Sequence, residues 1–186
     1  MTDRTGASIS QLVLKATGVN VAQCYQCGKC TAGCPMARFM DIQPNQVMRL
    51  VQIGDEQALR KVLAGTAIWS CAGCLTCTQR CPKKLDLAAV MDVLRQASHE
   101  QGCVAPRRKK VLAFHQAFLK TVEKGGRMSE MALVRRYKLA SMDLFSDLAL
   151  APRMLLRGKL KLKGHKIKGR KEIGRIFDLC RRQEAP

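Results

Sequence analysis

The sequence contains no uncharged apolar run of about 18 residues, the length from which a membrane-spanning helix is recognised. Its first residues also lack the basic, then apolar, then small-residue pattern of a secretory signal. Aromatic residues make up only 4% of the chain, so we expect a modest, aliphatic core. The lack of an apolar run and of a secretory signal predicts a cytoplasmic chain without a membrane span. Its 186 residues suffice for one compact domain or two small ones and exclude a large multidomain enzyme.

Acidic residues are scarce as well, because 14 Asp and Glu stand against 33 Lys and Arg. The excess of positive charge is concentrated late in the chain. Residues 103–186 carry 22 basic and 7 acidic side chains, a net charge of +15, whereas residues 1–102 carry 11 and 7. So basic a half is typical of proteins that meet an acidic protein surface, nucleic acid or an anionic membrane. Composition alone does not choose among these partners.

Cysteine, by contrast, is abundant, with ten residues in a chain expected to lie in a reducing compartment, where metal or redox chemistry is favoured over disulfides. Eight of the ten form two copies of the motif CxxCxxCxxxCP. The second copy lies 47 residues beyond the first at every cysteine and at the proline, which indicates an internal repeat. The motif residues are Cys24, Cys27, Cys30, Cys34 and Pro35 in the first copy and Cys71, Cys74, Cys77, Cys81 and Pro82 in the second.

This spacing is typical of two-cluster ferredoxins, in which three closely spaced thiolates bind one [4Fe–4S] cluster and the cysteine before proline binds the other. We therefore predict two [4Fe–4S] clusters with exchanged fourth ligands. A structural zinc pair or a disulfide knot is the alternative, but zinc sites separate their CxxC pairs by a longer loop. The predicted ligands are Cys24, Cys27, Cys30 and Cys81 for cluster one, and Cys71, Cys74, Cys77 and Cys34 for cluster two.

Several residues near the motifs allow both a functional and a structural interpretation. Gly28, Gly33 and Gly73 would let backbone N–H groups approach cluster sulfur, or would only permit tight turns. Trp69 would stand in an electron path or pack over a cluster. Four cations would raise the cluster potentials, meet an acidic partner or simply be solvated: Lys29, Arg80, Lys83 and Lys84. We assign no role to Cys103 or Cys180.

Hydrophobic periodicity and capping residues predict an all-α fold. Helices are expected over 9–15, 44–54, 55–64, from an N-cap at Asp86 to about 101, over 109–124, from Ser129 to about 144, and over 173–182. Lysine alternates with leucine in 157–171, which favours an extended segment lying on a partner. The predicted organisation is a lead-in over 1–22, a helical two-cluster ferredoxin-like domain over 23–102, and a basic, partly extended partner-docking region over 103–186.

The motifs resemble those of the C subunit of heterodisulfide reductase. The resemblance rests on Cys24-Tyr-Gln-Cys27-Gly28-Lys-Cys30-Thr-Ala-Gly-Cys34-Pro35, on the approach Ile68-Trp69-Ser-Cys71 to the second motif, and on the basic C-terminal extension. It implies a non-catalytic subunit that relays electrons between a flavin-containing iron–sulfur subunit and a cysteine-rich catalytic subunit with CCG domains. The resemblance also implies a hetero-oligomer, such as a dimer of heterotrimers. This chain has no adjacent Cys-Cys pair, so the cysteine-rich part must be a separate protein.

Two other classes remain open from the sequence. One is the iron–sulfur subunit of a different dehydrogenase, of the succinate, fumarate or glycolate type, although the CxxxxCxxC motif of the succinate and fumarate enzymes is missing. The other is a nucleic-acid-binding iron–sulfur protein. No aromatic residue is interleaved in the lysine-rich stretch 157–171 to stack on bases, so we expect no nucleic-acid partner.

Overall fold

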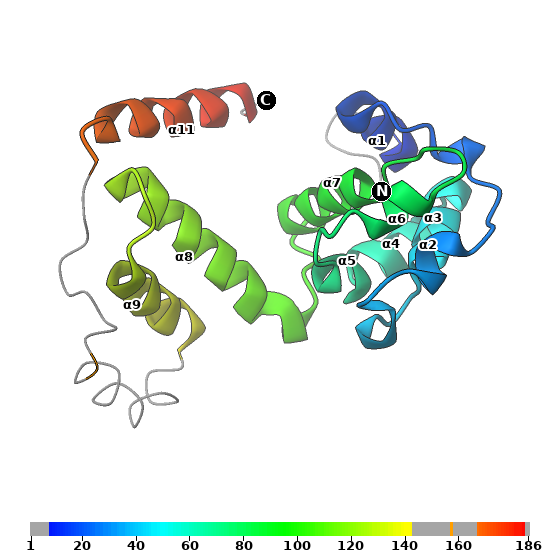
Figure 1. Ribbon diagram of the computed structural model, residues 1–186, viewed down its shortest axis with the longest axis horizontal. Helices are drawn as coiled ribbons and strands as arrows, with labels where there is room; N and C mark the ends of the chain where they lie inside the picture. Colours follow the sequence, from blue (N-terminus) through cyan, green and yellow to red (C-terminus); the bar gives the residue numbers. More distant parts are fainter. Residues whose placement is uncertain (1–7, 143–156, 158–166, 185–186) are drawn as a thin grey trace. The chain divides into compact units, whose positions relative to one another are not determined.

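The computed structural model describes residues 8–142, 157 and 167–184, shown in Figure 1. Within these residues every regular element is a helix and no strand occurs, which confirms the predicted all-α class. The chain divides into two compact units, Met1–Arg108 and Lys109–Pro186. Residues 103–108 belong to the first unit, where Ala105 is buried and Arg108 donates a hydrogen bond to the Ser70 hydroxyl at 2.7 Å.

The helices of the first unit begin and end where the sequence supplies capping groups. The Asp55 and Asp86 carboxylates accept hydrogen bonds from the amides of Ala58 and Ala89, at the starts of α4 and α7. Gly54 ends α3 in the left-handed conformation, with φ 68°. The helices predicted over 9–15, 44–54, 55–64 and from Asp86 to about 101 are confirmed, and three short helices that the sequence did not predict occur beside them. The helices are α1 (Ile9–Thr17), α2 (Lys29–Ala32), α3 (Pro44–Ile53), α4 (Glu56–Leu63), α5 (Ala67–Ser70), α6 (Thr76–Arg80) and α7 (Leu87–Glu100).

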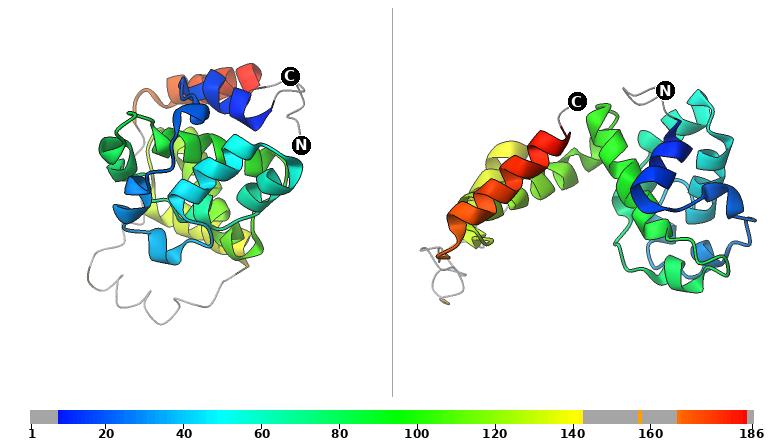
Figure 2. Two further views of the ribbon diagram at one scale, coloured as in Figure 1. Left: turned by 90° about the vertical axis from the view of Figure 1, so that its right-hand side faces the viewer. Right: turned by 90° about the horizontal axis from the view of Figure 1, so that it is seen from above.

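Helix α7 is central to the core of this unit. It packs against α1, α4, α5 and α6, and Figure 2 shows the dark blue α1 lying against the green α7. Leu94 of α7 is completely buried, as are Leu63 of α4 and Ile68 of α5. The Ser98 hydroxyl is also buried and donates to the Leu63 carbonyl at 2.7 Å, so this polar group is satisfied inside the core. A mainly aliphatic core thus supports the segments that carry the cysteines.

The short helix α5 has no counterpart among the helices predicted from the sequence. Its start is fixed by Asp41, which lies 25 residues before Thr66. The Asp41 carboxylate accepts hydrogen bonds from the amides of Thr66 at 2.7 Å, Ala67 at 2.8 Å and Ile42 at 3.0 Å. Burial by itself raises the pKa of Asp41, but these three amides outweigh it and the pKa is lowered. Asp41 therefore positions α5, which ends directly before Cys71.

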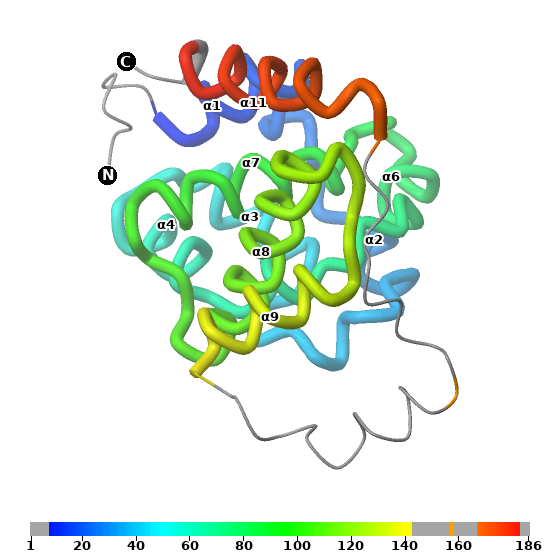
Figure 3. The backbone as a smooth tube through the Cα atoms, turned by 90° about the vertical axis from the view of Figure 1, so that its left-hand side faces the viewer, coloured from blue at the N-terminus to red at the C-terminus, as the bar shows by residue number. Residues whose placement is uncertain are grey.

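The second unit contains α8 (Lys109–Gly125), α9 (Glu130–Ser141) and α11 (Arg170–Glu184). Helix α8 packs against both α9 and α11, as Figure 3 shows. The rings of Phe114 and Tyr137 meet edge to face with centroids 5.9 Å apart, and Arg181 of α11 pairs with Glu123 of α8. Of the described side chains in this unit, only Ala117 and Thr121 are buried.

One part of the lysine-rich prediction needs correction. Residues 158–166 lie outside the described residues. Arg170 and Lys171, which are expected in the extended segment, are instead the first residues of α11. The Gly169 carbonyl accepts hydrogen bonds from the amides of Glu172 and Ile173 and so starts the helix earlier than the predicted residue 173.

Candidate metal centre

The two cysteine loops have left-handed residues at the same two positions of the repeat. Gln26 and Gly73, which are equivalent in the repeat, have φ 61° and 62°. Gly28 and Leu75, the next equivalent pair, have φ 75° and 60°. Backbone turns of this kind point successive N–H groups into one concavity, which is the arrangement of an anion-binding nest. Within the described chain none of the amides of 25–28 and 72–75 donates a hydrogen bond to a backbone carbonyl, so these groups are free to donate to a bound anion.

The cysteines differ in exposure in the same way in both loops. The second cysteine of each motif, Cys27 or Cys74, is exposed, whereas the other six are half-buried. Burial is the main cause that raises the pKa of Cys30 and of Cys77, and charge on the first cysteine of the same loop raises it further. The first and third cysteines of each loop therefore lie close to each other. Binding to metal would favour the thiolate form against this shift.

The fold brings the two loops together through α2 and α6, which pack against each other (Figure 1). Gly33 follows α2 and Arg80 ends α6, and these two positions are also equivalent in the repeat. A β-carbon at Gly33 would lie 2.6 Å from Cδ of Arg80, so the arginine side chain lies directly against Gly33. Cys34 and Cys81, the residues that follow this pair, are thereby carried to the junction of the two motifs.

Tyr25 shows where Cys81 lies relative to the first loop. Desolvation of the ring is the main cause that raises the pKa of Tyr25, although the residue is 56% exposed. Negative charge on Cys27, Cys81 and Cys24 raises this pKa further. Tyr25 is therefore close to two cysteines of its own motif and to the last cysteine of the other motif. For Cys34 the link to the second motif is indirect, through the contact of Gly33 with Arg80.

Each loop is attached to the helix that follows its motif. Thr31, after the third cysteine of the first motif, donates its hydroxyl proton to Oδ1 of Asn45 at 2.7 Å, in the first turn of α3. The equivalent Thr78 donates to Oδ1 of Asp86 at 2.8 Å, at the N-cap of α7. The two loops are therefore anchored to the core by equivalent threonines.

The donor set suits iron–sulfur clusters better than single ions. In the described part of the chain, no group of three or more Cys, His, Asp or Glu side chains is gathered tightly enough to bind one metal ion. A [4Fe–4S] cluster does not require such close approach, because each of its four thiolates binds a different iron. Eight cysteines in two loops equal the number of thiolates that two such clusters require, and the loop amides are free to donate to sulfur.

Comparison with known proteins agrees with this chemistry. Residues 20–85 match the family described as a 4Fe-4S dicluster domain. Two [4Fe–4S] clusters are therefore the cofactors of this domain. The chain is 30% identical over 105 residues to the C subunit of the H(2):CoB-CoM heterodisulfide,ferredoxin reductase of Methanothermobacter thermautotrophicus, a match covering 56% of this chain and 55% of that protein. It is 42% identical over 80 residues, 43% of this chain and 31% of the relative, to the C subunit of the ferredoxin:CoB-CoM heterodisulfide reductase of Methanosarcina acetivorans.

A third relative is the iron-sulfur C subunit of the CoB--CoM heterodisulfide reductase of Methanopyrus kandleri, 30% identical over 96 residues, which are 52% of this chain and 48% of the relative. The chain is similar to the C subunits of heterodisulfide reductases over about half of its length. This finding confirms the resemblance seen in the motifs. The matches span between about a third and just over half of the length of these relatives.

The remaining candidate residues near the two motifs and in the rest of the described chain divide into buried and exposed ones. Trp69 is only 8% exposed, and its indole N–H has no partner in the described chain. The Cys103 thiol donates to the Gln101 carbonyl at 3.5 Å, and Cys180 is exposed on α11. All four cations near the motifs, Lys29, Arg80, Lys83 and Lys84, are exposed. No helix in the described part of the chain is long and apolar enough to cross a membrane.

Sequence reasoning missed two kinds of residue at this site. The left-handed Gln26 and Leu75 were not singled out, although the repeat contains the signal, since each is aligned with a glycine of the other motif. Gln52 and Arg95, whose side chains reach backbone carbonyls of the two loops, were also missed. They are not equivalent in the 47-residue repeat, so the sequence carried no signal for them.

Proposed function

We propose that this chain is the electron-transfer subunit of a heterodisulfide-reductase-like complex, in which it relays electrons between a flavin-containing iron–sulfur subunit and a cysteine-rich catalytic subunit. The observation that carries the proposal is the packing of two equivalent cysteine loops against each other through α2 and α6. Two clusters held in this way are close neighbours. All eight motif cysteines are used as ligands, so no coordination position is left open for a substrate, unlike in a catalytic metal site.

The proposed ligands are Cys24, Cys27, Cys30 and Cys81 for cluster one, and Cys71, Cys74, Cys77 and Cys34 for cluster two. The closeness of Tyr25 to both Cys24 and Cys81 supports the first set. The contact between Gly33 and Arg80 supports the second, because it draws the segment before Cys34 to the end of the second motif. When bound, the clusters supply one-electron redox chemistry. The protein supplies the thiolates, the free loop amides and the aliphatic core that holds both loops in place.

The exposed second cysteines indicate where electrons would enter and leave. Cys27 lies beside Tyr25, which is 56% exposed, and Cys74 lies beside Leu75, which is 49% exposed. Each loop therefore presents a cysteine and an adjacent apolar or aromatic side chain to the surface. A donor protein that covers one loop and an acceptor protein that covers the other would each come into contact with a cluster ligand.

The second unit has the properties of a docking region. Five large apolar side chains of α8 and α11 are between 38% and 58% exposed, and the unit carries a large excess of lysine and arginine. We propose that a partner protein covers these side chains with an apolar surface bordered by acidic residues. The five exposed side chains are Phe114, Phe118, Leu119, Ile176 and Leu179.

The complex is tested by isolating the chain from its native cells without oxygen and identifying by mass spectrometry the proteins that remain bound. We expect a flavin-containing iron–sulfur subunit and a protein with adjacent Cys-Cys pairs. Recovery of nucleic acid alone would overturn the relay. Ile176→Asp replaces one apolar docking residue and should release the partner without changing the iron content. Arg175→Gln on the same helix is the control and should release less of the partner.

The ligand sets are tested by iron content and by electron paramagnetic resonance of the reduced chain. Cys81→Ser should perturb the cluster of the first loop, and Cys34→Ser that of the second loop. Cys103→Ser is the matched control, because this cysteine lies outside both motifs and should leave both signals unchanged. If Cys81→Ser altered only the cluster bound by Cys71, Cys74 and Cys77, the exchanged assignment would be wrong.

A further inference from the structure

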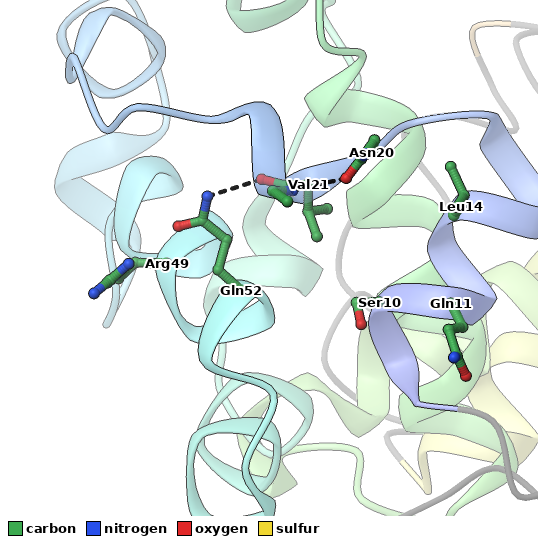
Figure 4. Close-up of a pocket in the computed structure, with 8 residues that line it drawn as sticks. Ser10, Gln11, Leu14, Asn20, Val21, Arg49 and Gln52 are labelled. Carbon is green, nitrogen blue, oxygen red and sulfur yellow. Dashed lines mark hydrogen bonds between the residues drawn. The ribbon is translucent and has the colours of Figure 1, made fainter.

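The first cysteine of each loop is held by a side chain from the helix that follows its own motif. In the first half, Gln52 of α3 donates Nε2 to the carbonyls of Cys24 and Val21, each at 2.8 Å. In the second half, Nη1 of Arg95 on α7 donates to the Cys71 carbonyl at 3.4 Å. Figure 4 shows the Gln52 amide turned toward Val21, whereas Arg49 of the same helix points away. The same structural task is thus performed by a neutral amide in one half and by a cation in the other.

The charge of Arg95 is poorly screened by solvent. Its side chain is 22% exposed, and it pairs with Asp92, which is 68% exposed and therefore well solvated. Asp86, near the same loop, accepts from the Ala89 amide at the start of α7, where the helix dipole stabilises its negative charge. Neither carboxylate replaces the direct bond between the Arg95 guanidinium and the backbone of the second loop.

We propose that Gln52 and Arg95 are matched positioning residues for the first ligands of the two clusters, and that Arg95 also raises the reduction potential of the cluster bound by the second loop. The proposal rests on the ligand sets given under the proposed function. Reduction adds one electron and therefore one negative charge, which a nearby guanidinium stabilises. When the two clusters share a single electron, Arg95 shifts the distribution of that electron from cluster one toward cluster two. This transfer requires no other reactant.

The test is Arg95→Gln, which reproduces the neutral amide found at Gln52. Redox titration of the loaded chain, followed by electron paramagnetic resonance, should show a lower midpoint for cluster two and an unchanged midpoint for cluster one. We expect the equilibrium constant for electron transfer from cluster one to cluster two to fall about tenfold, which is about 59 mV for a one-electron couple. Arg95→Lys, which keeps the positive charge, should retain most of the original potential.

Arg49→Gln is the matched control, because it removes an arginine from the exposed face of α3, three residues before Gln52, without touching a loop carbonyl in the described chain. The tuning role is wrong if Arg49→Gln lowers the midpoint potential of cluster two as much as Arg95→Gln does. It is also wrong if the two midpoint potentials stay equally far apart in an Arg95→Gln chain that carries both clusters. The positioning role of Gln52 predicts that Gln52→Leu loses up to half of the bound iron and leaves the midpoint of cluster two unchanged. Full retention of iron on dilution and storage would contradict that role.

Failure of this inference can be told apart from failure of the proposed function. If Cys71→Ser leaves the signals of both clusters unchanged, the ligand sets are wrong, and the inference falls with them. If Cys71→Ser alters the cluster two signal but Arg95→Gln does not move its midpoint, the relay stands and only the role of Arg95 is wrong.

Discussion

Replacing Asp41 with alanine should destabilise the first unit strongly, because one carboxylate accepts three amide hydrogen bonds there. A hydrogen bond to a charged group contributes about 1.5–3 kcal/mol. The Asp41 residue is exposed, so we reduce this to about 1 kcal/mol for each bond and expect a loss of about 3 kcal/mol. With an m-value of about 2 kcal/mol/M, the urea midpoint should fall by about 1.5 M.

The assay is anaerobic urea unfolding of the loaded chain, followed by circular dichroism of the helices. Asp55→Ala is the matched control, because Asp55 also starts a helix but accepts only one amide bond, at 2.6 Å from Ala58. Loss of a single N-cap costs about 1 kcal/mol, or a midpoint shift of about 0.5 M. Equal shifts in the two variants would refute the argument that the three bonds of Asp41 act together.

The pH dependence of this contribution follows from the lowered pKa of Asp41. A carboxylate with a lowered folded pKa stabilises the protein fully above the unfolded value, which is about 3.9 for aspartate, and loses that contribution as the pH falls through the folded pKa. Both values lie well below neutrality. The difference in stability between the unmodified chain and Asp41→Asn should therefore stay constant between about pH 6 and 8, and a steady change across that range would show that another group is responsible.

Three further substitutions test the core and the loops. Leu94→Ala removes a completely buried side chain and should cost about 2–5 kcal/mol in chemical unfolding; a cost below about 1 kcal/mol would mean that the site is not packed as described. Ser98→Ala leaves the Leu63 carbonyl without its partner and should lower stability by about 1–2 kcal/mol, whereas no loss would mean that another donor replaces the hydroxyl. Leu75→Gly relieves the strain of a left-handed leucine and should raise the free energy of unfolding by about 0.5–1 kcal/mol, which is measured as a higher thermal midpoint. A midpoint that does not rise would mean that the loop takes another conformation.

The helices of the first unit are predictable because their start and stop signals are local. Pro44 and Gly54 bracket α3, and Asp86 starts α7. The spacing of the cysteines likewise suffices by itself to single out the candidate ligands. In the second unit, the apolar pattern of α8 gives the helix correctly, but Phe114 and Phe118 remain partly exposed, while the smaller Ala117 and Thr121 are buried. Periodicity identifies an apolar face and does not say what covers it.

The features that sequence reasoning missed depend on contacts between distant residues. The N-cap residue of α5, Thr66, makes no side-chain capping bond, and the first amides are satisfied instead by Asp41, a residue 25 positions before Thr66. The bond from Arg95 to Cys71 spans 24 residues and that from Gln52 to Cys24 spans 28, and neither pair follows the repeat. Residues that fold back onto a loop from a later helix are invisible to spacing and composition, since their position depends on the tertiary packing.

The contact between α2 and α6 has a consequence for how the chain is made. The ribosome synthesises the first cysteine loop 47 residues before the second. At about 5–20 residues per second, the first loop exists for roughly 2–10 seconds without the helix it packs against. During that interval the half-buried Cys30 and Cys34 have no partner segment packed beside their loop. We expect production of intact protein to depend on anaerobic conditions, or on a factor that protects the first loop while the second is still being translated.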